Sequence, residues 1–174
     1  MKDGKKWISG KPLAIIVAIA ENYAIGLNNR LLWHISDDLK RFKKLTEGHT
    51  VVMGKKTYES LPVRPLKNRR NIVITDSPEE KFEGCLTVHS VEEAISLCDP
   101  YKMNFIIGGA SIYRQFLPLA DMLYLTRVHK LFHADTFFPE ISAEDWQCIS
   151  SEPGPEDPAL GFAYTYEIYT RTDK

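Results

Sequence analysis

The sequence predicts an α/β fold with a largely parallel sheet. Three observations support it: apolar runs alternate with amphipathic segments from residue 13 onward, glycines follow two of the runs, and no long helical pattern follows residue 122. Of the 174 residues, 44% are hydrophobic and 26% charged, which excludes a disordered chain. The length suits one domain with a single core. We expect a disordered extension over residues 1–11 and that domain over residues 12–174.

The first predicted strand is the uninterrupted apolar run Leu13–Ala20. A short, β-branched run is typical of a central strand covered on both faces. Lysines precede the run, and Ala18 and Ala20 resemble a cleavage site, so a secretory signal is the alternative. The run is short for a signal core and too short to cross a membrane, which favours the strand. Three widely spaced cysteines without a Cys-x-x-Cys pair favour a reducing compartment.

Seven further strands are predicted, with helices between the earlier ones. The strands lie near Thr50–Met53, Asn71–Thr75, Leu86–His89, Asn104–Ile107, Met122–Val128, Gln147–Ser150 and Ala163–Thr170. The last of them follow one another without a helix, so we expect antiparallel pairing at the sheet edge. Ser90 and Glu93 form a capping box ahead of one helix, which Pro100 ends.

Two strand-to-helix turns have a form that suits an anion. Gly54 follows one strand, Gly108 and Gly109 follow another, and glycine lets the backbone approach a ligand near free helix amides. Two such turns could hold the phosphates of one dinucleotide. Neither has the spacing of a Rossmann fingerprint or a Walker P-loop, so an ordinary tight turn is the alternative for each. Lys55 and Lys56 favour a cofactor with a 2′-phosphate.

One carboxylate is expected on the apolar side of a helix that Ser36 caps. Asp38 precedes Phe42 by four residues and Leu45 by seven, which places the three on one stripe. Partial desolvation would raise the pKa of Asp38 and suit it to proton transfer. Asp37 points away from that stripe and is interpreted as a first-turn acid that complements the helix dipole.

Other candidate residues lie on either side of this helix in the sequence. Trp33 can wall a pocket beside Asp38, although a core tryptophan is the commoner role. Gly26, Asn28 and Asn29 predict a mobile turn over the site, because these residues tolerate positive φ.

The charges are unevenly distributed along the chain. Residues 36–70 contain ten Lys and Arg against four Asp and Glu, whereas residues 131–174 contain two against nine. The basic segment suits anions, or is simply a solvated helix face. It lacks the interleaved aromatics of a nucleic-acid platform. His129 and His133 have no third ligand at metal spacing, so we interpret them as surface residues and expect no metal.

These residues together resemble the dihydrofolate reductase family. The match runs through Ile25-Gly26, Leu31-Leu32-Trp33, Asp38, Phe42 and Thr46, then VVMGKKTYES, RPLKNR, NIVIT, FIIGGASIYRQFLP, LYLTRV and DTFFP. The resemblance implies a three-layer fold with an eight-stranded, mostly parallel sheet, an antiparallel C-terminal strand and four flanking helices. Leu32 stands where the family usually has proline, and Ala110 replaces a frequent third glycine.

The resemblance also implies an activity. NADPH would reduce 7,8-dihydrofolate to 5,6,7,8-tetrahydrofolate, by hydride transfer to C6 and protonation at N5, and so supply one-carbon metabolism. Asp38 would bind the pterin 2-amino group and N3, Thr126 would hydrogen-bond that carboxylate, and Trp33 would hold a water near it. A cytoplasmic monomer that binds a small substrate or antifolate inhibitors, but no nucleic acid or membrane, is expected.

The remaining site residues follow from the same resemblance. The substrate slot is implied at Val17, Ala18, Leu39, Phe42, Leu61, Leu66, Arg69 and Ile107, with Arg69 pairing with the α-carboxylate. The NADPH site is implied at Ala18, Ile25, Leu31, Gly54, Lys55, Lys56, Thr57, Thr75, Gly108, Gly109, Ala110, Ser111, Ile112 and Tyr113. The Gly108-Gly109 peptide is expected to be cis. Two alternatives remain: a pyrimidine reductase of riboflavin synthesis with the same fold, and a non-catalytic nucleotide-binding module.

Overall fold

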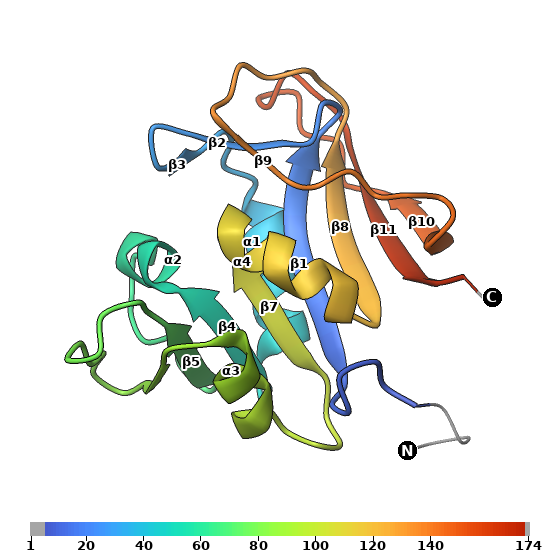
Figure 1. Cartoon of the computed structure of the whole chain (residues 1–174). Helices are drawn as coiled ribbons and strands as arrows, with labels where there is room; N and C mark the ends of the chain where they lie inside the picture. Colours follow the sequence, from blue (N-terminus) through green and yellow to red (C-terminus); the bar gives the residue numbers. More distant parts are fainter. Residues whose placement is uncertain (1–5, 173–174) are drawn as a thin grey trace. The chain divides into compact units, whose positions relative to one another are not determined.

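The computed structural model describes residues 6–172, and it contains four α-helices and a large sheet (Figure 1). The helices are α1 (Ser36–Thr46), α2 (Lys55–Ser60), α3 (Val91–Leu97) and α4 (Ala110–Phe116). The strands are β1 (Leu13–Ala20), β2 (Ala24–Leu27), β3 (Arg30–Leu31), β4 (Thr50–Gly54), β5 (Arg70–Ile74), β6 (Leu86–Val88), β7 (Asn104–Gly108), β8 (Met122–Val128), β9 (Thr136–Phe137), β10 (Trp146–Pro153) and β11 (Tyr164–Arg171).

The large sheet has eight strands in the order β10-β11-β8-β1-β7-β4-β5-β6. Its pairs β1/β7, β7/β4, β4/β5 and β5/β6 are parallel, while β8/β11 and β11/β10 are antiparallel. The predicted fold class is therefore confirmed, including the antiparallel pairing of the last strands. A second sheet, β3-β2-β9, was not predicted, because its strands of two to four residues are too short to show a periodic pattern.

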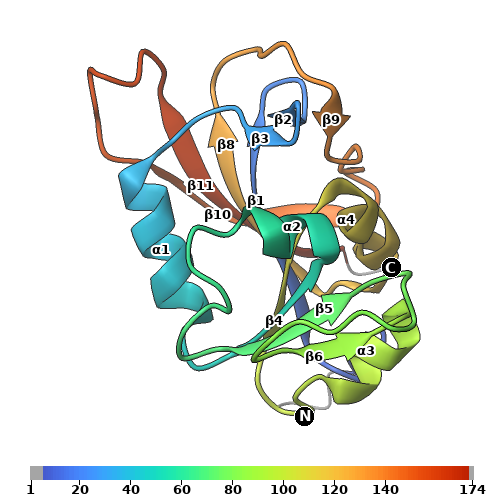
Figure 2. The ribbon, with the colours of Figure 1, turned by 90° about the vertical axis from the view of Figure 1, so that its left-hand side faces the viewer.

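The chain forms two compact units. The first comprises the described part of residues 1–15 with residues 44–121, and it contains strands β7, β4, β5 and β6. Its core is apolar and fully buried at Val51, Val52, Met53, Ile72 and Phe116. Within this unit α3 and α4 lie on the same side of the strands (Figures 1 and 2).

The second unit comprises residues 16–43 together with the described residues from 122 onward. Its antiparallel strands β8, β11 and β10 carry a core of Ile35, Val128 and Tyr164. Trp33 and Phe132 pack against this core with their ring centroids 5.1 Å apart. Partial burial of these rings against Val128 and Tyr164 stabilises the unit, because aromatic side chains bury large apolar areas.

Two helix starts can be compared with their predicted caps. The Ser90 side chain accepts a hydrogen bond from the Glu93 backbone amide at 3.1 Å, which confirms the cap of α3. Helix α1 begins at Ser36 itself, and the Leu39 amide already donates to the Ile35 carbonyl at 3.1 Å. Ser36 is therefore the first helical residue, so the helix begins one residue earlier than predicted and Ile35 takes the cap position.

The N-terminal segment contacts the first unit. Predicted disorder at residues 1–5 lies outside the described residues, but residues 6–11 are described and include a turn. The Lys11 Nζ donates to the carbonyls of Ile95, Ser96 and Cys98 at 3.0–3.2 Å. This ammonium adds a positively charged donor to carbonyls at the C-terminal end of α3, where helical amide partners run out.

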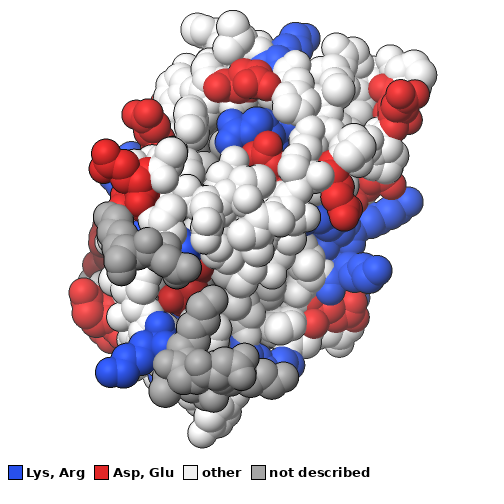
Figure 3. Space-filling view, turned by 90° about the vertical axis from the view of Figure 1, so that its right-hand side faces the viewer, with Lys and Arg blue, Asp and Glu red and all other residues white. Residues whose placement is uncertain are grey.

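The surface carries mixed charge. On the face drawn in Figure 3, acidic and basic side chains are interspersed without one continuous basic patch. Among the described residues, no helix is long and apolar enough to cross a bilayer.

Candidate active site

The structure places Asp38 in the first turn of α1, in the second unit. The buried Thr126 of β8 donates from Oγ1 to Asp38 Oδ1 at 2.5 Å. Burial raises the pKa of Asp38, while the Thr126 hydrogen bond and the Arg41 charge lower it. Asp38 is partly buried and Asp37 is exposed, as the helical stripe predicts. A carboxylate in this setting is poised to exchange a proton.

Apolar side chains of the same unit remain open to solvent. In β1 only Val17 and Ala18 are not buried, although the other six residues are. Leu39, next to Asp38 on α1, is 49% exposed. Val17 and Ala18 are two of the residues implied for the substrate slot. Phe42 is partly buried.

Trp33 and the loop before it also belong to the second unit. Trp33 is partly buried in the Ile35 cluster, and its implied role of holding a water stays a prediction. Asn28 and Asn29 have positive φ values of 52° and 62°, as expected for these residues in a turn, whereas the mobility of the turn and its place over the site stay predictions. The Asn28 amide donates to Asp135 Oδ2 at 3.0 Å, so the turn is tied to the segment before β9. Of the two implied cofactor residues beside this turn, Ile25 is buried and Leu31 is 76% exposed.

The two glycine turns lie side by side in the first unit, because Met53 at the end of β4 pairs with Gly108 at the end of β7. A Cβ on Gly54 would lie 3.0 Å from Ile112 Cγ1, and a Cβ on Gly108 would lie 3.1 Å from Thr57 Oγ1. The Gly108-Gly109 peptide is cis, as the resemblance implies. A Cβ at either position would require these side chains to shift, and the φ of 130° at Gly108 is one that other residues rarely adopt, so each turn presents bare backbone to its surroundings.

The helices that follow these turns begin without a side-chain cap. Neither Gly54 ahead of α2 nor Gly109 ahead of α4 provides one, so their first amides are available to an anion. These residues therefore fit the pyrophosphate of a dinucleotide. Ala110 and Ser111 open α4, whereas Tyr113 is buried and donates from its hydroxyl to the Ile107 carbonyl at 2.8 Å.

An acid that sequence reasoning missed contacts two of the implied cofactor residues. Lys55 Nζ lies 2.8 Å from Glu80 Oε2, and Thr75 Oγ1 donates to Glu80 Oε1 at 2.6 Å. The hydrogen bond from Lys55 holds the pKa of Glu80 below its ordinary value, and Glu80 in turn raises the pKa of Lys55. Lys56 is exposed and leaves its charge open to a phosphate. Glu80 follows β5 by six residues, in an acidic turn that no motif singles out.

Arg69 stands immediately before β5. Its Nε donates to the Lys67 carbonyl at 2.8 Å and its Nη1 to Thr46 Oγ1 at 3.2 Å. Burial lowers the pKa of Arg69. It borders two hollows of about 360 and 380 Å³, so a guanidinium held by neutral partners faces open space. Leu61 and Leu66, also implied for the substrate slot, are partly buried nearby in the sequence.

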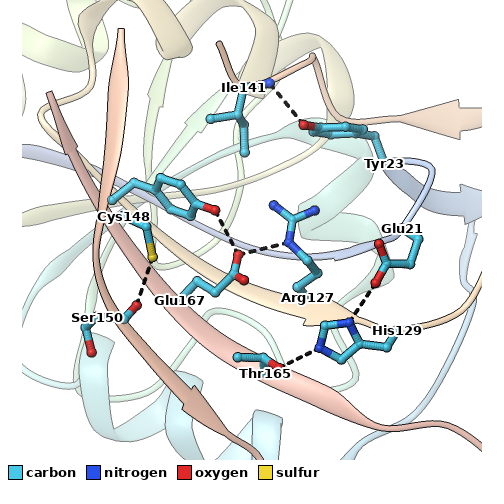
Figure 4. A network of polar contacts seen from close by, with 10 residues as sticks. Glu21, Tyr23, Arg127, His129, Ile141, Cys148, Ser150, Thr165 and Glu167 are labelled. Atoms are coloured by element: carbon cyan, nitrogen blue, oxygen red, sulfur yellow. Dashed lines mark hydrogen bonds and ion pairs between the residues drawn. The ribbon is translucent and has the colours of Figure 1, made fainter. Parts of the chain in front are cut away.

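His129 takes part in a polar network at the surface of the second unit (Figure 4). Its Nδ1 lies 2.6 Å from Glu21 Oε1 and its Nε2 lies 2.5 Å from Thr165 Oγ1. Arg127 and Glu167 form an ion pair of 2.9 Å in the same view. Within residues 6–172, no group of three His, Cys, Asp or Glu side chains could hold a metal ion. The network ties β8 and β11 to the turn after β1.

Comparisons with known proteins agree on one family. The model of the family described as dihydrofolate reductase matches residues 12–171. The dihydrofolate reductase of Bacillus subtilis (strain 168) is 41% identical over 159 residues, covering 91% of this chain and 94% of that protein. The Neisseria gonorrhoeae enzyme of the same name is 43% identical over 157 residues, covering 90% and 96%.

A solved structure shows the same likeness in three dimensions. Dihydrofolate reductase from Enterococcus faecalis, complexed with NADP(H) and RAB-propyl, aligns with a TM-score of 0.85 and 41% identity. The alignment covers 95% of this chain and 99% of that one. The buried carboxylate, the paired glycine turns and these matches lead to one conclusion: the chain belongs to the dihydrofolate reductase family.

Proposed function

We propose that the protein reduces 7,8-dihydrofolate to 5,6,7,8-tetrahydrofolate with NADPH, and that Asp38 is the ionisable group which acts on the pterin. The observation that supports this most directly is the Asp38 carboxylate, which is partly buried and hydrogen-bonded by Thr126. The same unit leaves Val17 and Ala18 only partly buried and Leu39 exposed. A flat apolar heterocycle with a polar edge needs such a combination of apolar surface and one carboxylate.

The chain's own residues would divide the work as follows. NADPH, when bound, supplies the hydride. The bare backbone at Gly54 and at Gly108-Gly109 would hold its phosphates, and Lys55 and Lys56 would meet the 2′-phosphate. Arg69 would bind the substrate's α-carboxylate.

On the substrate side, Asp38 would hold the pterin by its 2-amino group and N3 and assist the proton that reaches N5. Apolar walls would exclude water from the reacting atoms. We further propose that the protein acts as a monomer in the cytoplasm on this small molecule, which size-exclusion chromatography would test for the oligomeric state.

The test is a spectrophotometric assay of NADPH consumption with dihydrofolate, repeated for Asp38→Asn over a range of pH. The variant is expected to lose hydride transfer steeply at neutral pH and to recover as the pH falls, because the substrate then arrives protonated. Asp37→Asn is the matched control, since Asp37 is the exposed neighbour on the same turn. A near-normal rate with a flat pH response in Asp38→Asn would remove Asp38 from the mechanism.

The same assay separates the alternatives. NADPH binding without consumption would indicate a nucleotide-binding module. Consumption with a ribityl aminopyrimidine but not with dihydrofolate would indicate a pyrimidine reductase. The family match favours dihydrofolate over both.

A further inference from the structure

Arg41 lies three residues after Asp38 on α1, and residues at this spacing are neighbours on the same side of a helix. Its guanidinium carbon sits 4.3 Å from the centroid of the Tyr166 ring, within the range of a cation–π interaction. Tyr166 belongs to β11 and pairs directly with Thr126 of β8. Thr126 in turn donates to Asp38. The four residues therefore form a cluster on α1, β8 and β11.

Arg41 is partly buried and is fixed by the aromatic ring instead of by an acid. Among the described residues, no ion pair joins Arg41 to a carboxylate. Its charge therefore acts on Asp38 without occupying the carboxylate oxygens. A direct ion pair would block those oxygens, which the substrate needs for its 2-amino group and N3 under the proposed function.

The other titratable groups around this cluster are acids and tyrosines, so Arg41 is the cation that acts on Asp38. They are Asp37 and Asp38 in α1, Tyr124 in β8, Tyr164 and Tyr166 in β11, and Asp157. Burial raises the pKa of each of the three tyrosines, so they are neutral at physiological pH. Burial also raises the pKa of Asp38, and Arg41 opposes that rise together with the Thr126 hydroxyl.

We propose that Arg41 is a positioning residue for the reaction: held over the Tyr166 ring, it keeps a positive charge beside Asp38 and sets the protonation of that carboxylate without binding to it. This inference rests on the proposed role of Asp38 in the reaction. The Tyr166 ring would hold the guanidinium in place without an ion pair between Arg41 and Asp38.

The experiment measures the protonation of Asp38 directly, by NMR titration of its side-chain carboxyl carbon in the full-length protein. Arg41→Gln is expected to move the titration midpoint to higher pH, by about three- to tenfold in the protonation constant. Arg41→Lys, which keeps the charge, is expected to restore most of the shift. Lys40→Gln is the matched control, because it removes one exposed charge from the same helix and should leave the midpoint in place.

A second pair of variants tests the ring. Tyr166→Phe keeps the aromatic face and should leave the midpoint near that of the wild type, whereas Tyr166→Leu should raise it in the same direction as Arg41→Gln. This pair also carries the test should Arg41→Gln fail to fold. An unchanged midpoint in folded Arg41→Gln, or equal effects of Phe and Leu at position 166, would overturn the inference.

The pH profile of kcat/KM, measured on the same variants, separates this inference from the proposed function. When the profile moves with the NMR midpoint, both hold. When the NMR midpoint moves but the profile does not, Arg41 still governs Asp38, and the proposed catalytic role of Asp38 fails instead.

Discussion

Replacing Thr126 with valine tests how strongly one hydroxyl controls the acid of the site. Valine has nearly the shape of threonine, and Thr126 is only 3% exposed, so the substitution removes the donor with little change in packing. The lost contact is the 2.5 Å hydrogen bond to Asp38 Oδ1. A hydrogen bond to a charged group contributes about 1.5–3 kcal/mol, so the protonated form of Asp38 should gain about 10- to 100-fold over the ionised form.

The sign follows from which form the hydroxyl binds. Thr126 donates to the carboxylate and thereby lowers the pKa of Asp38, so Thr126→Val should raise that pKa. We expect the midpoint of the pH profile of kcat/KM to move to higher pH, with the KM for NADPH unchanged. Thr165→Val is the control, because the Thr165 hydroxyl contacts His129, just after β8, and not Asp38. A midpoint that stays in place, or moves to lower pH, would refute the reasoning.

Three further substitutions probe stability and cofactor choice. Asp38→Asn should raise the free energy of unfolding at pH 7, because a carboxyl group whose pKa is raised in the folded state destabilises the fold when it is ionised. In urea titrations this gain in stability should vanish as the pH falls through the raised pKa towards 3.8. No gain at pH 7 would contradict the prediction. Glu80→Gln should tighten NADPH binding severalfold in fluorescence titrations, because it frees Lys55 from its ion pair to meet the 2′-phosphate. NADH, which lacks that phosphate, should bind as before. Equal changes for both cofactors would count against the prediction. Asn104→Leu should lower the free energy of unfolding, measured in urea, by about 3–5 kcal/mol. The fully buried Asn104 side chain accepts a hydrogen bond from the Asp99 amide and donates to three backbone carbonyls, all of which would lose their partner. A loss below about 1 kcal/mol would contradict the prediction.

Local patterns predicted the parts of the fold that depend on a few consecutive residues. The run Leu13–Ala20 forms β1, and Ser90 caps α3. Both could be predicted because an apolar run and a helix cap each depend on a few neighbouring residues. The two glycine turns were predicted for the same reason, since a backbone that must approach its neighbours closely requires glycine wherever the fold places it.

The site was predictable only in part. Helical spacing alone separated Asp38 from Asp37, and the structure confirms that separation. Glu80 was missed because its contacts with Lys55 and Thr75 join segments up to 25 residues apart, and one acid in an acidic turn has no distinguishing pattern. Arg41 was missed because its significance depends on Tyr166, which lies on a strand 125 residues later in the chain.

The groups around Asp38 have opposing effects on its pKa. Burial alone would drive the carboxyl towards its neutral form, in which it could not serve as a charged partner for the pterin. A direct ion pair with an arginine would hold it ionised and would occupy the oxygens that, under the proposed function, bind the substrate. One hydroxyl donor and one cation held at a distance over an aromatic ring give an intermediate result, because each opposes burial and neither covers both oxygens. Under the proposed function Asp38 both binds the pterin and assists a proton transfer, so removing either opposing group should change the pH dependence of the reaction before it changes the fold.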